Sequence, residues 1–348
     1  MKHTTLKITG LALAIAAAAF TARADVALNE NVSLYGYAAA SFQFNKPNTG
    51  NTNTTMDLDA AKLGFAFNFA PVTAKVSFYA KDGDLFLLEA NATYDIAAVK
   101  GLSVTAGRFQ SWLGYEAFDI PNCTFITYGT DVFGFIIPNF HEGVKAEFKV
   151  DKMDFGLAVV NSVASVPFEY RGEGRLNNGY GVEARFGFKD GDFSLAATLA
   201  YQNSRGNSWF SDVLNKNTYV ADVWAQYVLN SKTTFGAELY YLQSNTCQFH
   251  GGGSHHNFGI FYGLVMAKHQ FNDKFSLAGR VSAGQDKWKA FSDKANFMKL
   301  SVQPAYALTK NLGVGAELSY TKYNKTARLD YGVPKDNVFL GVQAVFKF

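Results

Sequence analysis

Apolar and polar residues alternate with a period of two through most of the chain, the pattern of a β-strand that has one apolar face and one polar face. Between Gly181 and Lys189 every second residue is apolar, and the same holds from Val338 to Phe348. This alternation predicts sixteen strands in the chain. We expect them at residues 32–44, 58–69, 72–81, 85–96, 102–110, 140–150, 153–162, 179–189, 193–203, 218–229, 234–244, 257–271, 275–285, 296–308, 312–323 and 337–348.

The connectors between these strands form two alternating classes. Seven are short and lie at residues 70–71, 97–101, 151–152, 190–192, 230–233, 272–274 and 309–311. The other eight, most of them longer, lie at residues 45–57, 82–84, 111–139, 163–178, 204–217, 245–256, 286–295 and 324–336. An even strand count with short turns at one end and long loops at the other is typical of outer-membrane barrels. The sequence therefore predicts an all-β fold, a transmembrane antiparallel β-barrel of about 16 strands with short periplasmic turns and long extracellular loops.

The alternative to a barrel is a soluble β-sandwich, which buries its apolar faces in a dry core and lacks the two classes of connector. In lipid every backbone donor and acceptor needs a partner, so a sheet there must close on itself. Tyrosines near the predicted strand ends fit the two aromatic belts of such a barrel at the membrane surfaces. They are Tyr79, Tyr94, Tyr201, Tyr227, Tyr306 and Tyr320.

The first 24 residues have the pattern of a secretory signal. A positive start at Lys2, His3 and Lys7 precedes an apolar run over 8–20, and Ala22-Arg23-Ala24 offers a cleavage site before Asp25. A membrane anchor is the alternative, but the run is shorter than the ~20 residues that span a bilayer. We expect a signal peptide over 1–24 and an outer-membrane barrel over 25–348.

The net charge of +3 comes from the expected signal, because removing three of 32 basic residues leaves 29 against 29 acidic ones. The rest of the chain has no basic stripe, which argues against a nucleic-acid partner. After Asp25 no apolar stretch approaches 18 residues, which excludes a helical membrane protein.

The longest connector, between the fifth and sixth predicted strands, differs from the rest. Its region contains Gly107-Arg108-Phe109, Trp112-Leu113-Gly114-Tyr115-Glu116, Asp119-Ile120-Pro121-Asn122 and Phe133-Gly134-Phe135-Ile136-Ile137-Pro138, followed by His141 and Gly143. These runs, and Leu34-Tyr35-Gly36-Tyr37 in the first strand, resemble the OmpL-like β-barrel porins. The resemblance is specific over about residues 32–148 and only architectural afterwards, and Cys123 departs from the family pattern. It implies a porin in the outer membrane of a Gram-negative cell without naming what permeates.

The segment 111–139 is the third outward loop by position. In general porins, which the chain resembles in this respect, that loop folds inward and narrows the channel. The resemblance therefore makes Tyr115, Glu116 and Asp119 candidates for a pore constriction. The alternative is an external loop whose aromatic residues cover the barrel mouth.

The polar faces of the predicted strands carry the information on ion selectivity. The alternation directs six basic and six acidic residues into the lumen, a balance that predicts no preferred sign of ion. The basic residues are Lys62, Lys75, Lys145, Arg185, Arg280 and Lys299, and the acidic ones are Glu89, Glu147, Glu183, Asp222, Glu238 and Glu317.

Motifs for catalysis and cofactor binding are absent from the sequence, so we expect neither an enzyme nor a cofactor. Cys247, His250, His255 and His256 are weak candidates for zinc or copper ligands, but three glycines beside them argue against a preorganised site. Cys123 and Cys247 both lie on the predicted outer side, where a disulfide between them and two separate thiols are both open.

Phe348, preceded by apolar residues at every second position, resembles the signal read by the barrel assembly machinery of Gram-negative outer membranes. We expect a water-filled channel for passive diffusion of small hydrophilic solutes or ions, surrounded by outer-membrane lipid. A homotrimer and a lone barrel both remain open. The alternatives are a closed barrel with a structural or adhesive role and an embedded hydrolase.

Overall fold

The computed structural model describes residues 25–48, 50–116, 118–163, 179–204, 215–248, 255–288, 294–330 and 332–348, so the predicted signal peptide lies outside the described residues. The long strands are β2 (Val32–Pro47), β3 (Asn53–Phe69), β4 (Val72–Lys81), β5 (Asp84–Asp95), β6 (Leu102–Gln110), β7 (Phe140–Val150), β8 (Met153–Val160), β9 (Gly179–Asp190), β10 (Phe193–Ser204), β11 (Asn215–Asn230), β12 (Thr233–Gln248), β13 (His255–Gln270), β14 (Phe275–Trp288), β15 (Asn296–Ala307), β16 (Leu312–Tyr323) and β17 (Asp336–Lys347). The remaining elements are the two-residue strand β1 (Val26–Ala27), the 3-10 helices η1 (Ile120–Asn122) and η2 (Asp131–Ile136), and the helix α1 (Lys325–Asp330).

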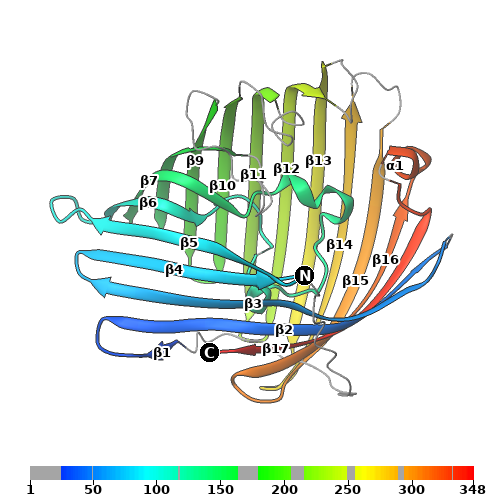
Figure 1. The fold of residues 1–348 in the computed structure, drawn as a ribbon, viewed down its shortest axis with the longest axis horizontal. Coiled ribbons are helices and arrows are strands. Elements are labelled where there is room, and N and C mark those ends of the chain that lie inside the picture. The colour runs from blue at the N-terminus through cyan, green and yellow to red at the C-terminus, as the bar shows by residue number, and fades with distance from the viewer. Residues whose placement is uncertain are drawn as a thin grey trace, which may run out of the picture.

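These strands form one closed antiparallel barrel (Figure 1). Each long strand pairs with the next one along the chain, and β17 pairs with β2 to close the ring, with Leu340 opposite Phe44. At this seam the Gly36 N–H donates to the Phe348 carbonyl at 2.9 Å, and the Phe348 N–H donates back to Gly36 at 3.1 Å. Closure leaves the sheet without a free edge, as a sheet in lipid requires.

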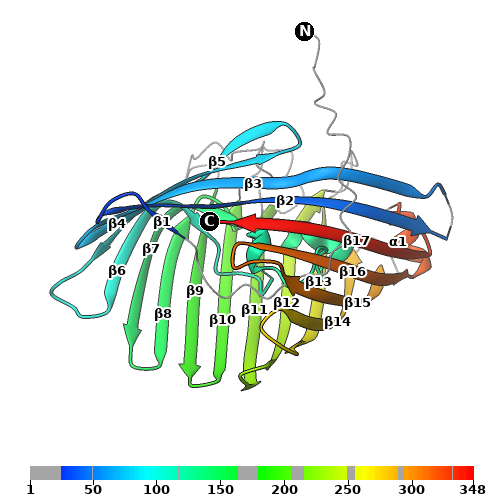
Figure 2. The same cartoon turned by 90° about the horizontal axis from the view of Figure 1, so that it is seen from below.

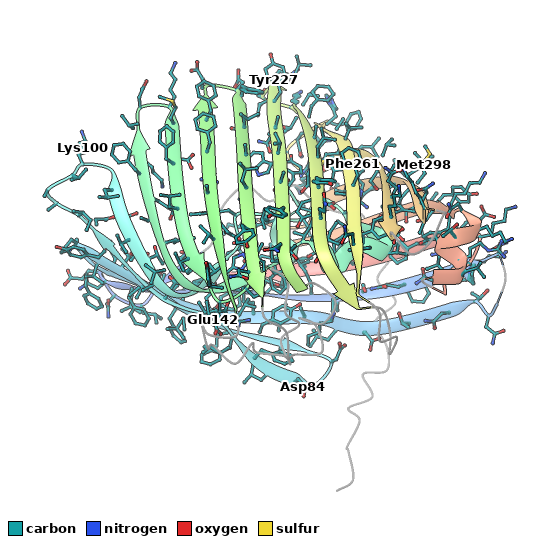
Figure 3. All side chains as sticks on the ribbon, turned by 90° about the horizontal axis from the view of Figure 1, so that it is seen from above. Asp84, Lys100, Glu142, Tyr227, Phe261 and Met298 are labelled. Atoms are coloured by element: carbon teal, nitrogen blue, oxygen red, sulfur yellow. The ribbon has the colours of Figure 1, made fainter. Side chains whose placement is uncertain are left out.

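The two faces of the sheet differ sharply in exposure. Glu238 is 2% exposed whereas its neighbour Leu239 is 57% exposed, and Glu317 and Leu318 show the same contrast at 0% and 51%. Tyr227, Phe261 and Met298 are among the large apolar residues exposed on the outer face (Figure 3). The outer surface is therefore apolar, and the polar side chains of the strands point into the barrel.

The sixteen predicted strands are all present, which confirms the predicted fold class. Several extend further than the alternation predicts at the end that carries the long loops, for example β12 to Gln248 and β13 from His255. At that end the strands extend beyond the membrane, where the alternation of apolar and polar residues stops. The backbone hydrogen bonds between the strands continue there, because they do not depend on this alternation. The helix α1 was not predicted; Asn324 Oδ1 caps it by accepting the Ala327 N–H at 2.9 Å. Within the described ranges, no helix is long and apolar enough to cross a membrane.

One of the predicted interfacial tyrosines was placed wrongly. Tyr79 is 6% exposed and lies inside the barrel, with its ring 5.2 Å from that of Phe118. It shares the inward phase of Lys75 and Ser77 on β4, and this phase takes precedence over its position near a strand end.

Apolar packing also occurs inside the barrel, where the segment 111–139 meets the wall. A larger cluster joins this segment to β12–β15 and includes Leu113, Phe133, Ile136, Tyr240, Tyr262 and Phe297. A smaller one joins it to β2–β5 and β7 and includes Tyr37, Tyr79, Leu88, Phe118, Ile120 and Phe140. The interior is thus partly a packed core and partly open.

Candidate channel constriction

The segment 111–139 lies inside the barrel, enclosed by the strands in both views (Figures 1 and 2). Where it enters, the Ser111 hydroxyl lies 2.9 Å from His141 Nε2. The same nitrogen lies 2.9 Å from Glu183 Oε1, and His141 Nδ1 lies 2.7 Å from the Ser162 carbonyl oxygen. This buried histidine fixes the start of the segment to β7 and β9.

The next residues bind two neighbouring strands through their backbone. The Gly114 N–H donates to Asp222 Oδ2 on β11 at 2.8 Å, and the Tyr115 N–H donates to Glu238 Oε1 on β12 at 2.9 Å. Gly114 has a φ of +91°, and a Cβ atom there would lie 2.6 Å from Ile137 Cγ2. Only glycine tolerates both conditions, so the turn that presents these N–H groups depends on it.

Tyr115, the first predicted constriction residue, lies against the β11–β12 wall. Its ring is 5.6 Å from that of Trp224 and covers Gly236, and its hydroxyl donates to Gln226 Oε1 at 3.1 Å. Burial raises the pKa of Tyr115 to about 12, with a further contribution from Glu116. The phenol therefore stays neutral at physiological pH.

Glu116, the second candidate, forms an ion pair with Arg280 on β14, and its other carboxylate oxygen accepts the Gly129 N–H at 2.5 Å. Arg280 also donates to the Thr127 carbonyl at 2.8 Å, and its guanidinium carbon lies 4.2 Å from the centre of the Phe125 ring. Glu116 and Arg280 thus hold the segment folded on itself and attach it to the wall.

Asp119, the third candidate, lies on the opposite side of the lumen. Both of its carboxylate oxygens accept hydrogen bonds from Lys62 Nζ on β3, at 2.9 and 3.1 Å. Lys62 also lies 3.0 Å from Glu89 Oε2 on β5. Because Tyr115 and Asp119 contact opposite walls, the segment crosses the lumen.

The second half of the segment returns to β14–β16. The Thr127 N–H and hydroxyl donate to the two carboxylate oxygens of Glu317 at 2.7 and 2.6 Å. Asp131 lies 3.0 Å from Lys299 Nζ and accepts a hydrogen bond from Tyr323. Sequence reasoning did not single out Thr127 or Asp131, since nothing in the strand pattern relates them to the wall.

The twelve wall charges named from the sequence fall into three groups. Lys62, Asp222, Glu238, Arg280, Lys299 and Glu317 bind the segment directly. Glu89 and Glu183 reach it through Lys62 and His141. Lys75, Lys145, Glu147 and Arg185 lie nearer the periplasmic end; Lys145 pairs with Glu147 at 3.0 Å, and Arg185 pairs with Asp154.

The predictions for the cysteines and histidines stay predictions. Cys123 follows η1, where its N–H donates to the Ile120 carbonyl at 3.1 Å, and burial raises the pKa of its thiol to about 12. The backbone of Cys247 lies opposite that of His256 in the β12–β13 ladder. The side chains of Cys247, His255 and His256, and the whole of His250, lie outside the described residues.

A cavity of about 780 Å³ opens inside the barrel toward the periplasmic turns. Its lining comes from the inner faces of β2–β7 and from the stretch 27–31 near the periplasmic turns, and includes Lys75, Asn91, Thr93, Thr105, Lys145 and Glu147. Polar and charged side chains dominate this list, so the cavity is suited to water and hydrophilic solutes.

Comparison with known families decides the identity of this barrel. The family model described as "Putative beta-barrel porin-2, OmpL-like" matches residues 29–348. The chain belongs to this porin family. No curated protein sequence matches it. Its place as a porin of the cell outer membrane follows from the family together with the closed barrel.

Solved outer-membrane proteins share the architecture. OmpF of Salmonella typhi, in complex with daunomycin, is 17% identical over 93% of this chain and 100% of that one, with a TM-score of 0.65. DcaP, an outer membrane channel of Acinetobacter baumannii, is 12% identical over 91% and 97%, with a TM-score of 0.63. OmpT of Vibrio cholerae is 14% identical over 93% and 100%, with a TM-score of 0.61. At these identities the likeness shows the fold alone.

Proposed function

We propose that solutes and ions cross this porin by passive diffusion along the β2–β7 wall, and that the segment 111–139 sets the narrowest cross-section of the route. The observation that carries the proposal is the division of the lumen. The segment packs against the wall on both sides of the lumen, and the polar cavity of about 780 Å³ lies against β2–β7 on its periplasmic side.

Asp119 is the constriction residue best placed to meet a permeating solute. Its side chain keeps 23% exposure while it pairs with Lys62, whereas the side chain of Glu116 keeps only 11%. Tyr115 is held flat on the opposite wall by Trp224 and Gln226. We therefore assign Asp119 to the rim of the passage, with Glu116 and Tyr115 as the anchors that keep the segment across the lumen.

The proposed mechanism is partition and sieving, with no chemical step. The lumen replaces bulk water for the solute, and the cross-section and local field at the segment decide what passes. Twelve hydrogen bonds and ion pairs described above tie the segment to the wall, so its shape is fixed before a solute arrives. The enzyme alternative gains nothing from Ser111 and the buried His141, because both form part of this anchoring.

Modification of single cysteines in the lumen tests the route. In a chain whose own cysteines are replaced by serine, Thr93→Cys places a thiol in the cavity and Asp119→Cys places one at the segment. Ala92→Cys, on the exposed outer face of the same strand, is the matched control. A charged methanethiosulfonate reagent should lower the single-channel conductance of the two lumen variants in planar bilayers and leave the control unchanged.

The mass of each protein after labelling shows whether its cysteine has reacted with the reagent. Unchanged conductance in fully labelled Thr93→Cys and Asp119→Cys would place the route elsewhere. Folded wild-type protein that never opens a channel would instead favour the closed barrel with a structural or adhesive role.

We also propose a homotrimer, in the lipid of the outer membrane, as the working assembly. A trimer form of Vibrio cholerae OmpT, 14% identical with a TM-score of 0.57, is the support for this proposal. Native mass spectrometry in detergent tests it, since a trimer has three times the mass of the mature chain. A single-chain mass under conditions that keep the barrel folded would favour the lone barrel.

A further inference from the structure

We infer that the lumen is polarised along its axis, acidic at the segment 111–139 and basic on the periplasmic side, and that this porin consequently prefers cations and rectifies ionic current. The inference rests on the proposed route, and its experiment is chosen to separate the two. The inference goes beyond the balanced count of wall charges, because the segment 111–139 itself adds only negative charge.

The acidic zone comes from adding the segment to the wall. Residues 111–139 contain three acidic residues and no Lys or Arg. The wall residues that bind the segment directly, or through Lys62 and His141, supply five acids and three bases, so eight negative groups face three positive ones and the formal excess is five. The acids are Glu89, Glu116, Asp119, Asp131, Glu183, Asp222, Glu238 and Glu317, and the bases are Lys62, Arg280 and Lys299.

Two of these acids have no basic partner in the part of the chain that the structure describes. Asp222 and Glu238, on neighbouring strands, are 1% and 2% exposed, and each receives one backbone N–H from the segment. The second oxygen of each, Asp222 Oδ1 and Glu238 Oε2, lacks a hydrogen-bond partner among the described residues. A proton shared between the two carboxyl groups would lower the excess only from five to four.

The periplasmic side carries the opposite excess among the described residues. Besides Glu89, which is counted in the acidic zone above, the charged residues that line the cavity are Lys75, Lys145, Lys149, Glu30, Asp95 and Glu147. Arg185 pairs with Asp154, and Lys189, Lys268 and Lys347 continue the inward phase of Gly187, Leu264 and Val345. Seven basic groups thus face four acidic ones, an excess of three. The two zones lie in series along the route.

Charges of one sign around a pore enrich the opposite ion, and the effect reaches about 10 Å at 0.1 M salt but only about 3 Å at 1 M. The acidic zone is the narrower one, so it sets the preference for cations. When two zones of opposite charge lie in series, one voltage polarity drives cations and anions into the lumen and raises their concentration there. The opposite polarity drives both ions out and lowers it. Current at the two polarities should therefore differ.

Single-channel recordings of the full-length mature protein test this inference. In 0.1 M KCl the currents at opposite voltages of equal size should differ by about 1.5-fold or more, and in 1 M KCl they should agree within about 10%. In a KCl gradient the reversal potential should show K⁺ preferred over Cl⁻ by about threefold or more.

The double variant Lys149→Glu with Lys189→Glu removes the basic excess at two exposed positions. It should abolish the rectification and strengthen the preference for K⁺. The matched control is Lys100→Glu with Lys232→Glu, which makes the same charge change on the periplasmic turns outside the lumen and should leave the ratio of currents as in wild type (Figure 3 labels Lys100). Altered mobility of unheated protein on gels verifies that every variant is folded.

Symmetric currents at 0.1 M KCl, a preference for Cl⁻, or a ratio unchanged by the first double variant would overturn the inference while channels still open. Folded protein that opens no channel would contradict the proposed function instead.

Discussion

Arg280 on β14 forms an ion pair with Glu116, which precedes it by 164 residues. The same guanidinium lies 3.5 Å from Glu317 Oε1 on β16 and donates to the Thr127 carbonyl at 2.8 Å. The Arg280 side chain has no exposed surface. One buried cation therefore connects two parts of the segment 111–139 to two strands of the wall, and its partners depend on one another.

A double-mutant cycle should measure this dependence. Glu116→Gln removes one of the two carboxylates that pair with Arg280, and Arg280→Gln leaves Glu116 and Glu317 without a cationic partner. Each change should lower the free energy of unfolding by about 3–5 kcal/mol. The double variant should cost less than the sum, with a coupling of about 1–3 kcal/mol. Urea unfolding of the barrel in lipid vesicles, followed by tryptophan fluorescence, provides the measurement.

The matched control for this cycle is the pair Lys152–Asp190 on the periplasmic turns, 2.8 Å apart and half exposed. Its coupling should stay below about 1 kcal/mol, because water screens an exposed pair. Equal coupling in the two cycles would contradict the view that Arg280 holds the segment in place.

Val342 and Gln343 are neighbours on β17 that face lipid and lumen. Val342→Arg should cost about 2–4 kcal/mol if the side chain meets the bilayer midplane, whereas Gln343→Arg should be tolerated in the lumen. Gln343 Nε2 donates to Asp59 Oδ2 at 2.8 Å, so an arginine there meets an acid rather than hydrocarbon. The yield of folded barrel after refolding into vesicles compares the two variants. Similar yields would mean that the two faces are assigned the wrong way round.

The strand pattern predicts the wall well because side-chain direction in a strand has a strict period of two. Glu238 and Leu239 illustrate this: one residue separates a buried acid from an exposed leucine, as the alternation requires. Tyr79 follows the same rule. Its position near a strand end predicted a place at the membrane surface, but its phase on β4 directs it into the barrel.

The contacts of the segment 111–139 lie beyond this kind of reasoning. Asp131 meets Lys299 because η2 turns it toward β15, and no periodicity in the segment fixes that turn. Family resemblance led to Tyr115, Glu116 and Asp119 through the position of the loop. It did not lead to the backbone N–H groups of Gly114 and Thr127, whose hydrogen bonds depend on the three-dimensional path of the chain.

Tyr115 should make the anchoring of the segment sensitive to high pH. Its pKa is raised from the usual 10 to about 12, mainly by burial, so the stabilisation is complete below about pH 10 and is lost as pH rises to about 12. Tyr115→Phe should reduce the loss of unfolding free energy over this interval, because the phenol that must ionise is absent. The ultraviolet absorbance of tyrosinate, compared between wild type and variant, identifies the group. An identical titration in both would exclude Tyr115.

Cys123 should react slowly while the barrel is folded. Burial raises the pKa of its thiol to about 12, so the reactive thiolate is scarce at pH 8. The side chain is half-buried inside the barrel, with Sγ 3.7 Å from the Asp119 carbonyl oxygen. In a Cys247→Ser background, a maleimide should label the folded protein at least about 100-fold more slowly than the urea-unfolded protein. In the wild-type chain, unfolding without reductant adds the test of the predicted bridge to Cys247: two labels per chain would exclude a disulfide, and none would establish one. Fast labelling of the folded variant would contradict the shielding of Cys123 by the barrel and the segment.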